Sequence, residues 1–161
     1  MTTNRIPGFI WASVSVGIFR NMEDIEYALS KMCTSRTWDK SLSFCIQPAA
    51  TLDLVTIRPS LFGGKGNMSR TEICKLGESI GLQECPQEVG PQLLIQGKVE
   101  KGIEEVFIAS TEPMGSKNDV FLTISSRYGP LWLNCYVDFT EGFNSGDVWV
   151  FVKPRKQEKR Q

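Results

Sequence analysis

The chain of 161 residues contains no histidine. Histidine is the side chain that titrates near neutral pH, so its absence excludes Ser-His-Asp and Cys-His nucleophiles and every zinc site that requires imidazole. No C-x-x-C pair occurs either, so the local spacing of a four-cysteine zinc site or of a thioredoxin-type motif is missing. We therefore expect a protein that is not an enzyme and that has no catalytic residues, no metal site and no bound cofactor.

The cysteines do not form the pattern of a disulfide framework, because their number is odd and they are scattered along the chain. Two of them, Cys45 and Cys135, fall within apolar alternations, where a thiol usually acts as a small hydrophobic side chain. Reduced thiols are typical of the cytoplasm or the nucleus, so an intracellular location is expected. The five positions are Cys33, Cys45, Cys74, Cys85 and Cys135.

Long apolar runs are missing as well. No stretch approaches the roughly 18 residues that span a bilayer, and no signal-peptide core follows Arg5. Any association with membranes is therefore expected to be peripheral. Carboxylate pairs suited to acid/base chemistry are also scarce. The nearest pairs, Glu104 with Glu105 and Glu84 with Glu88, are expected to be solvated surface acids.

Charge is balanced overall but not along the chain. The 18 Lys and Arg residues equal the 18 Asp and Glu residues in number, so no global basic field marks the protein as a dedicated nucleic-acid binder. Residues 153–161 nevertheless carry a net charge of +4, which leaves −4 on residues 1–152. A mildly acidic body therefore ends in a basic segment.

The length and an apolar content of 41% suit one globular domain. We expect an N-terminal arm over residues 1–8, a single α+β domain over residues 9–153 and a basic C-terminal tail over residues 154–161. Two amphipathic helices are predicted in the N-terminal half, and short strands separated by turn-rich pieces follow. The sheet is therefore expected to be mainly antiparallel.

Alternation of apolar and polar residues with a period of two predicts the strands. In the last strand both faces are apolar, so Trp149 and Phe151 either pack beneath a helix or form an interface with a partner. A helix cover is the commoner arrangement. The predicted strands span residues 9–18, 42–46, 52–57, 93–99, 106–109, 120–125, 131–139 and 148–153.

The two helices are predicted from caps and from apolar spacing. Asn21 can accept a hydrogen bond from the first turn of a helix that runs to about Cys33. Ser69 and Glu72 form a capping box at the start of the second helix, and Gly81 supplies a left-handed stop at its end.

A glycine-rich loop is the local feature that resembles a ligand-binding motif. Gly64, Lys65, Gly66 and Ser69 lie between a strand and a capped helix, an order in which glycine permits close backbone approach and a helix N-terminus attracts phosphate. The loop departs from the phosphate-loop pattern because Gly66, rather than Ser or Thr, follows Lys65. It departs from the dinucleotide pattern because Ser69 replaces the third glycine. Phosphate or nucleotide binding at this loop is one alternative, and a flexible loop ahead of a helix explains the glycines adequately.

The basic tail is a second candidate site. Its side chains can contact phosphate on RNA, on a nucleocapsid or at an anionic membrane surface. They can equally solubilise the chain end or form a nuclear-import patch. Because the tail follows the last apolar strand, deletion of residues 153–161 is expected to weaken anion binding without unfolding the body. The basic residues are Lys153, Arg155, Lys156, Lys159 and Arg160.

The first third of the chain resembles a known family. A strand that begins with an aromatic residue, over residues 9–16, precedes a helix that begins after Asn21, and a short strand around Phe44 follows. This order resembles the opening of the matrix-protein core of rhabdoviruses, and the length resembles that of the small matrix proteins of plant rhabdoviruses. The proline-rich budding motif and the basic N-terminal arm of that family are absent. The resemblance implies a virion structural protein that self-associates, condenses the nucleocapsid and lies beneath the envelope.

A second resemblance concerns Gly63 and Gly64. A strand that leads to a diglycine is similar to the end of ubiquitin, and residues 61–66 resemble the processing site of the silencing-defective splicing regulators, where cleavage follows the diglycine. Only one strand, rather than a hairpin, precedes the first helix, and the Arg/Lys-rich helix of that family is absent. This alternative implies an interaction module with a ubiquitin fold that is processed after Gly64.

These patterns favour a non-enzymatic structural or interaction domain, with a viral matrix protein as its most specific form. The expected partners are further copies of the chain and, through the tail, nucleoprotein, RNA or an anionic membrane surface. No small-molecule substrate is expected.

Overall fold

The computed structural model describes residues 10–32, 43–99, 104–126 and 131–155. Within these ranges it confirms the predicted fold class, an α+β domain whose sheet is mainly antiparallel. The predicted N-terminal arm over residues 1–8 lies outside the described residues.

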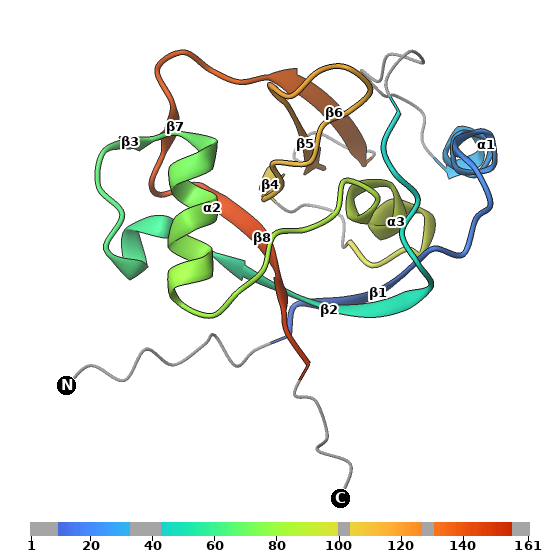
Figure 1. Ribbon diagram of the computed structural model, residues 1–161, viewed down its shortest axis with the longest axis horizontal. Coiled ribbons are helices and arrows are strands. Elements are labelled where there is room, and N and C mark those ends of the chain that lie inside the picture. Colours follow the sequence, from blue (N-terminus) through green and yellow to red (C-terminus); the bar gives the residue numbers. More distant parts are fainter. Residues whose placement is uncertain (1–9, 33–42, 100–103, 127–130, 156–161) are drawn as a thin grey trace, which may run out of the picture.

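Six strands form the main sheet in the order β1-β2-β8-β4-β5-β6 (Figure 1). Neighbouring strands are antiparallel except β4 and β8, which are parallel. A separate two-stranded sheet pairs β3 with β7. The strands are β1 Ala12–Val16, β2 Ala50–Ile57, β3 Asn67–Met68, β4 Val106–Ile108, β5 Val120–Ser125, β6 Trp132–Val137, β7 Phe143–Asn144 and β8 Val148–Lys153.

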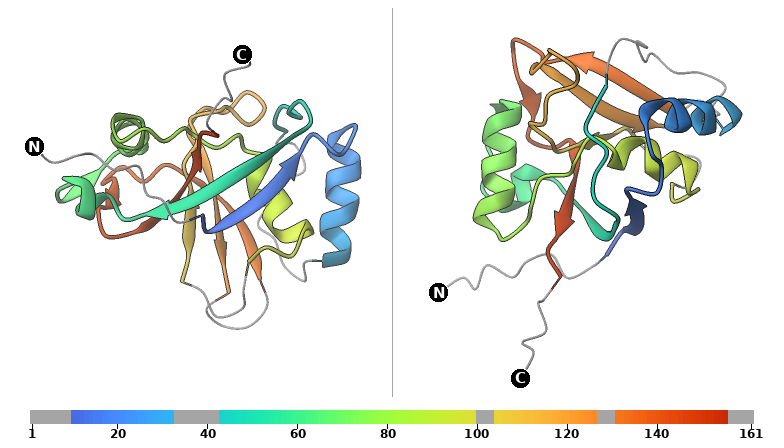
Figure 2. Two further views of the ribbon diagram at one scale, coloured as in Figure 1. Left: turned by 90° about the horizontal axis from the view of Figure 1, so that it is seen from below. Right: turned by 45° about the vertical axis from the view of Figure 1, so that its right-hand side comes forward.

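Helices cover both faces of the sheet. α2 (Arg70–Ser79) lies on the opposite side of β8 from α1 (Met22–Met32) and α3 (Val89–Ile95) (Figures 1 and 2). A 3₁₀ turn, η1 (Pro59–Phe62), follows β2. The buried apolar side chains accordingly form two clusters, one with α1 and α3 and one with α2. The alternating strands supply one side chain to each cluster in turn.

Both predicted helix starts are confirmed. The Asn21 Oδ1 atom accepts a hydrogen bond from the backbone N–H of Asp24 at 3.0 Å, and the Ser69 Oγ atom accepts one from the backbone N–H of Glu72 at 3.1 Å. Gly81 has a φ of 89°, as expected for the residue that ends α2. Local sequence therefore determines where α1 and α2 begin.

The predicted strand over residues 42–46 is wrong for the residues that the structure describes, which are 43–46. Their backbone groups bind a neighbouring loop: the Ser43 carbonyl accepts from Gly115 N at 2.5 Å, and Cys45 N donates to the Glu112 carboxylate at 3.3 Å. Cys45 is exposed, so it is not the small core residue that the alternation indicates.

The predicted strand over residues 93–99 is also wrong, because α3 occupies Val89–Ile95. A short apolar run such as residues 93–95 fits a buried helix as well as a strand. Pro91 lies in the first turn of this helix, where a backbone N–H has no partner within the helix and its loss costs little. Leu93 and Leu94 are buried against the sheet.

Trp149 and Phe151 are fully buried, so of the two arrangements that the sequence allows, the helix cover is confirmed and the interface with a partner is wrong. Both belong to the cluster beneath α2. At Gly77 of α2, an added Cβ atom would lie 2.1 Å from the Phe151 ring. The helix therefore rests directly on the outer face of β8.

The β1 end of the sheet is closed by the side chains of the two residues that flank α3, Glu88 before it and Gln96 after it. The Gln96 amide accepts a hydrogen bond from Ser15 N at 3.0 Å and donates one to the Ser15 carbonyl at 2.7 Å, as a further strand would. Glu88 accepts one from Gly17 N at 2.8 Å. Glu88 is fully buried, so it is not the solvated acid that the sequence indicates.

Candidate functional site

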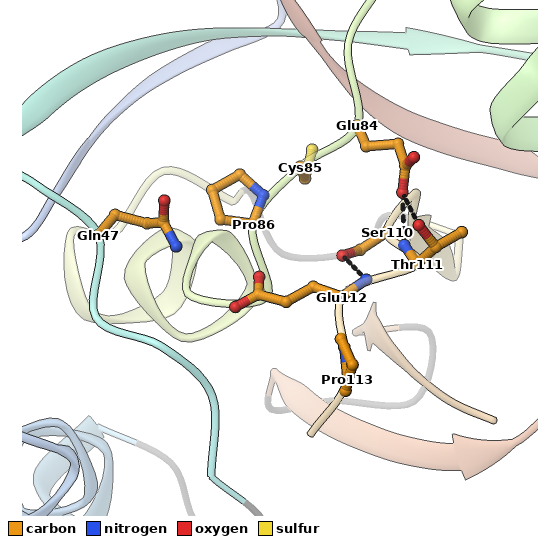
Figure 3. A pocket seen from close by; sticks show the side chains of 8 residues that line it. All are labelled: Gln47, Glu84, Cys85, Pro86, Ser110, Thr111, Glu112 and Pro113. Atoms are coloured by element: carbon orange, nitrogen blue, oxygen red, sulfur yellow. Dashed lines mark hydrogen bonds between the residues drawn. The ribbon is translucent and has the colours of Figure 1, made fainter. Parts of the chain in front are cut away.

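A pocket of about 510 Å³ opens at the surface of the described structure (Figure 3). It opens between two loops that face each other across the end of the sheet. Glu84, Cys85 and Pro86 come from the segment between α2 and α3, and residues 110–113 follow β4. Gln47 completes the lining.

The two carboxylates of this pocket hold the loops together. Glu84 accepts hydrogen bonds from the backbone N–H and the hydroxyl of Thr111, at 2.5 and 2.6 Å. Glu112 accepts them from Gln87 N at 2.7 Å and from Cys45 N at 3.3 Å. Each carboxylate thus satisfies backbone amides that no strand pairs. These hydrogen bonds give the two carboxylates a structural role, which is to hold the two loops together, rather than a role in proton transfer.

The thiol of Cys85 lies at the back of the same pocket and is fully buried. Burial raises its pKa well above the ordinary value, and the nearby Cys74 and Glu84 raise it further. The Sγ atom donates to the Val150 carbonyl at 3.3 Å. The group is a protonated thiol at neutral pH, whereas the nucleophilic form of cysteine is the thiolate.

The cysteines are therefore expected to differ in reactivity. A maleimide or iodoacetamide reagent at about pH 7.5 should modify Cys45, which is exposed, and should leave Cys74 and Cys85 unmodified until the protein unfolds. Burial raises the pKa of Cys74 to about 12. Mass mapping of peptides with and without denaturant measures the difference. Rapid modification of Cys85 in the folded protein would contradict the assignment of this thiol as structural.

The glycine-rich loop uses most of its candidate anion-binding groups internally. Gly64 N donates to the Pro59 carbonyl at 2.9 Å, and the Ser69 hydroxyl caps α2. The Gly66 carbonyl accepts from Ser145 N at 3.1 Å, which fixes the loop beside β7. Lys65 is exposed. The structure therefore brings these residues together as a folded turn, with Ser69 and Gly64 already occupied.

The diglycine at Gly63 and Gly64 lies inside the domain, between η1 and β3. Gly63 has a φ of 94°, and a Cβ on Gly64 would lie 2.8 Å from Met68 Sδ and from the Pro59 carbonyl. Cleavage after Gly64 would place β2 and β8 on different fragments, although these strands pair along five residues. Both glycines thus have a structural reason to be present.

Two of the five basic residues proposed as an anion-binding site, Lys153 and Arg155, contact the folded domain. Lys153 is the last residue of β8, opposite Asp53 of β2. Arg155 forms two hydrogen bonds with the Asp53 carboxylate, at 3.0 and 3.2 Å. These two basic residues are therefore part of the fold. Lys156, Lys159 and Arg160 lie outside the described residues.

Deletion of residues 156–161 is expected to leave thermal stability unchanged, whereas deletion of 153–161 or Arg155→Ala should lower it. The Arg155 guanidinium, and after it the Ser13 hydroxyl, lower the pKa of Asp53. A lowered pKa in the folded state stabilises the fold at pH values above that of the unfolded carboxyl, about 4. The stabilisation is lost as the pH falls below 4 and Asp53 becomes protonated. Melting temperatures of wild type and Arg155→Ala measured from pH 7 to pH 2.5 should therefore converge at the acidic end.

An aromatic patch lies on the α2-facing side of β6, the strand at the other end of the sheet from β1. Trp132 and Tyr136 point to this side along β6, and Phe139 follows in the next loop. We define the aromatic patch as these three side chains, whose exposed fractions are 38%, 37% and 49%. The sequence gives the signal for the first two, because Trp132, Asn134 and Tyr136 alternate with apolar residues along the strand.

The patch rests on buried rings. Tyr136 and Phe139 contact Phe121, with centroids 5.6 and 5.5 Å away. Phe121 in turn contacts Phe143 and Phe107, at 5.0 and 5.9 Å, and both of these contact Trp149. A continuous set of ring contacts therefore connects Tyr136 and Phe139 of the patch to the core.

The part of the chain that the structure describes contains no cluster of three Cys, Asp or Glu side chains placed to hold a metal ion. Among its helices, none has the length and apolar character needed to cross a membrane. The chain matches no protein-family model, no curated protein and no solved structure.

Proposed function

We propose that this chain is a non-enzymatic assembly protein that associates with further copies of itself. The observation that supports the proposal is the aromatic patch of Trp132, Tyr136 and Phe139, which is partly exposed and of which Tyr136 and Phe139 rest on the buried Phe121 ring. Trp and Tyr are enriched at protein interfaces, where a large rigid side chain contributes contact area at little cost in conformational entropy.

The two ends of the sheet support the same proposal. The β1 end is closed by the amide of Gln96 and the carboxylate of Glu88. At the β6 end, the exposed side of the strand carries rings. Proteins commonly protect an end strand with charges or proline, and Trp132–Val137 contains neither. A surface of this composition suits contact with another protein chain.

The most specific form of the proposal is a viral matrix protein. In that form the tail would contact nucleocapsid RNA or an anionic membrane, and self-association would build a layer. The support is the resemblance of the N-terminal third, of which the strand and the helix occur in the described structure as β1 and α1. The location would then be the cytoplasm or nucleus of the host cell and the virion.

Light scattering after size exclusion, over a range of protein concentrations, tests the proposal. We expect species larger than the monomer that grow with concentration, and we expect the double variant Trp132→Ser/Phe139→Ser to lose them. Both side chains are partly exposed, at 38% and 49%, so the variant should stay folded, with a cost of about 1–2 kcal/mol. Leu61→Ser is the matched control, because Leu61 is 75% exposed on η1 and lies outside the patch.

A wild-type chain that remains a monomer at the highest soluble concentration would overturn the proposed function. Equal loss of the larger species in Leu61→Ser would show that association depends on apolar surface in general rather than on the aromatic patch.

A further inference from the structure

We propose that the aromatic patch of one copy binds the basic C-terminal tail, residues 156–161, of a second copy, so that the chains associate head to tail. The inference rests on the proposed function and names the two surfaces that would meet. It follows from the chemistry of the patch, from its area and from the distance between the patch and the start of the tail.

The chemistry of the patch suits a cationic peptide. The side chain of Asn134, between Trp132 and Tyr136, donates to Thr123 Oγ1 at 3.5 Å, and this hydroxyl donates to the Glu105 carboxylate at 2.6 Å. Glu105 lies close enough to Tyr136 that its charge, together with burial, raises the tyrosine pKa. Aromatic faces beside a carboxylate attract Lys and Arg through cation–π contacts and ion pairing.

A second carboxylate lies at the other side of the patch. A surface hollow of about 330 Å³ is lined by Phe139, Glu141 and the residues beside them, and Glu141 is exposed. Asp138, in contrast, is bound to the buried Arg70 with an Nε to Oδ1 distance of 3.0 Å. Glu105, which is half-buried, and Glu141 therefore remain available to a partner. The tail supplies the opposite charge, with three basic residues and one acidic residue among its six.

The area of the patch matches a short peptide better than a whole domain. With about 200 Å² for a complete aromatic side chain, the exposed fractions give about 250 Å². One side of a standard protein interface buries about 800 Å². Two patches packed face to face would therefore leave most of such an interface to other surfaces. A segment of six residues needs no more than the patch and its neighbouring carboxylates.

The backbone of the same chain's tail falls short of the centre of the patch. Arg155 is held at Asp53 on β2, four strand positions from β6. At about 4.8 Å per strand this is about 19 Å across the sheet. The pairing places Asn134 in line with Trp149 of β8, and hence about 13 Å along the strands from Lys153.

The span along the sheet is therefore about 23 Å, whereas Arg160, the last basic residue, follows Arg155 by five residues, at most about 18 Å of backbone. Helix α2 also covers the face of the sheet between them. The geometry thus favours a tail from a second copy. Because patch and tail are different surfaces, such a contact can repeat from copy to copy and build a ring or a filament.

Mixing two complementary variants tests this inference. One variant carries Lys156→Gln, Lys159→Gln and Arg160→Gln and keeps the patch, and the other carries Trp132→Ser/Phe139→Ser and keeps the tail. We expect each to be monomeric alone and the equimolar mixture to form a dimer of twice the monomer mass that grows no further. High salt should dissociate it, because the contact depends on charge.

Each other outcome identifies which proposal fails. If the variant without the three basic side chains associates as well as the wild type, the tail-binding inference is overturned and the proposed function stands. Two monomeric variants that do not combine also overturn it, since a symmetric patch-to-patch contact cannot be complemented. If a short RNA binds the wild type through these lysines and the association of chains is unchanged, the tail binds nucleic acid instead. A wild type that is strictly monomeric overturns the proposed function itself.

Discussion

Arg70→Met should destabilise the protein by about 3–5 kcal/mol, because removal of one member of a buried charged network leaves its partners without counterparts. Arg70 is 6% exposed and begins α2. Its Nη1 atom donates to the carbonyls of Ser110 and Val120, at 2.6 and 3.0 Å. Its Nη2 atom donates to the Asn118 carbonyl and to Asp138 Oδ2, at 2.8 and 3.0 Å. One guanidinium thus joins α2 to both ends of the loop between β4 and β5 and to the end of β6.

Urea unfolding measures the loss, and two further variants make it specific. Arg70→Lys keeps the charge but lacks the planar set of donors, so most of the stability should still be lost. Arg58→Met removes an arginine that is half exposed and paired with the exposed Glu104, so its cost should stay at or below about 1 kcal/mol. Comparable losses in Arg58→Met and Arg70→Met would contradict the assignment of Arg70 as the anchor of this region.

Sequence predicted the elements whose signals are local. The caps at Asn21 and Ser69 and the stop at Gly81 are readable because each acts on backbone within three or four residues. The strand over residues 148–153 was predicted with the bounds that the structure gives to β8. The strand could be predicted from its alternation, because consecutive residues face different apolar clusters.

The errors have a common physical origin, which is that distant residues decide the local structure. The segment around Cys45 alternates like a strand, yet its backbone binds Glu112 and Gly115 from the other half of the chain. Glu88 looks like a surface acid, but its buried carboxylate accepts three hydrogen bonds. Two come from the distant backbone amides of Gly17 and Gln47, and one comes from the side chain of Gln92, one helical turn away. No local pattern announces such partners.

The candidate surfaces were predictable only in part. Outward aromatics on β6 can be recognised by alternation, whereas the contact of Phe139 with Phe121 depends on the turn after the strand. The basic tail is plain from its charge. That Arg155 belongs to the fold is not, because Asp53 lies 102 residues earlier. Composition therefore favoured the hypothesis of an interaction protein, and the packing shows which aromatic side chains are exposed.

Gly77→Ala should be the second large effect, at about 2–4 kcal/mol of lost stability. The new Cβ atom would lie 2.1 Å from Cε1 and 2.5 Å from Cζ of the Phe151 ring, so the helix or the ring has to move. Alanine is favoured over glycine within a helix by about 1 kcal/mol, which offsets only part of this cost. Lys75→Ala, on the exposed side of the same helix, should change stability by less than about 0.5 kcal/mol.

A double-mutant cycle separates the steric cause from a general weakness of α2. Phe151→Leu alone should destabilise the protein by about 1–3 kcal/mol, because the smaller side chain leaves a cavity beneath the helix. In the double variant Gly77→Ala/Phe151→Leu the added methyl occupies part of that cavity, so the two losses should sum to more than the measured one. Strict additivity would mean that Gly77 does not set the approach of α2 to β8.

Because this contact buries Phe151 beside Trp149, its loss should also loosen the buried rings on which Tyr136 and Phe139 rest. The Gly77→Ala chain should then self-associate more weakly even where it remains folded.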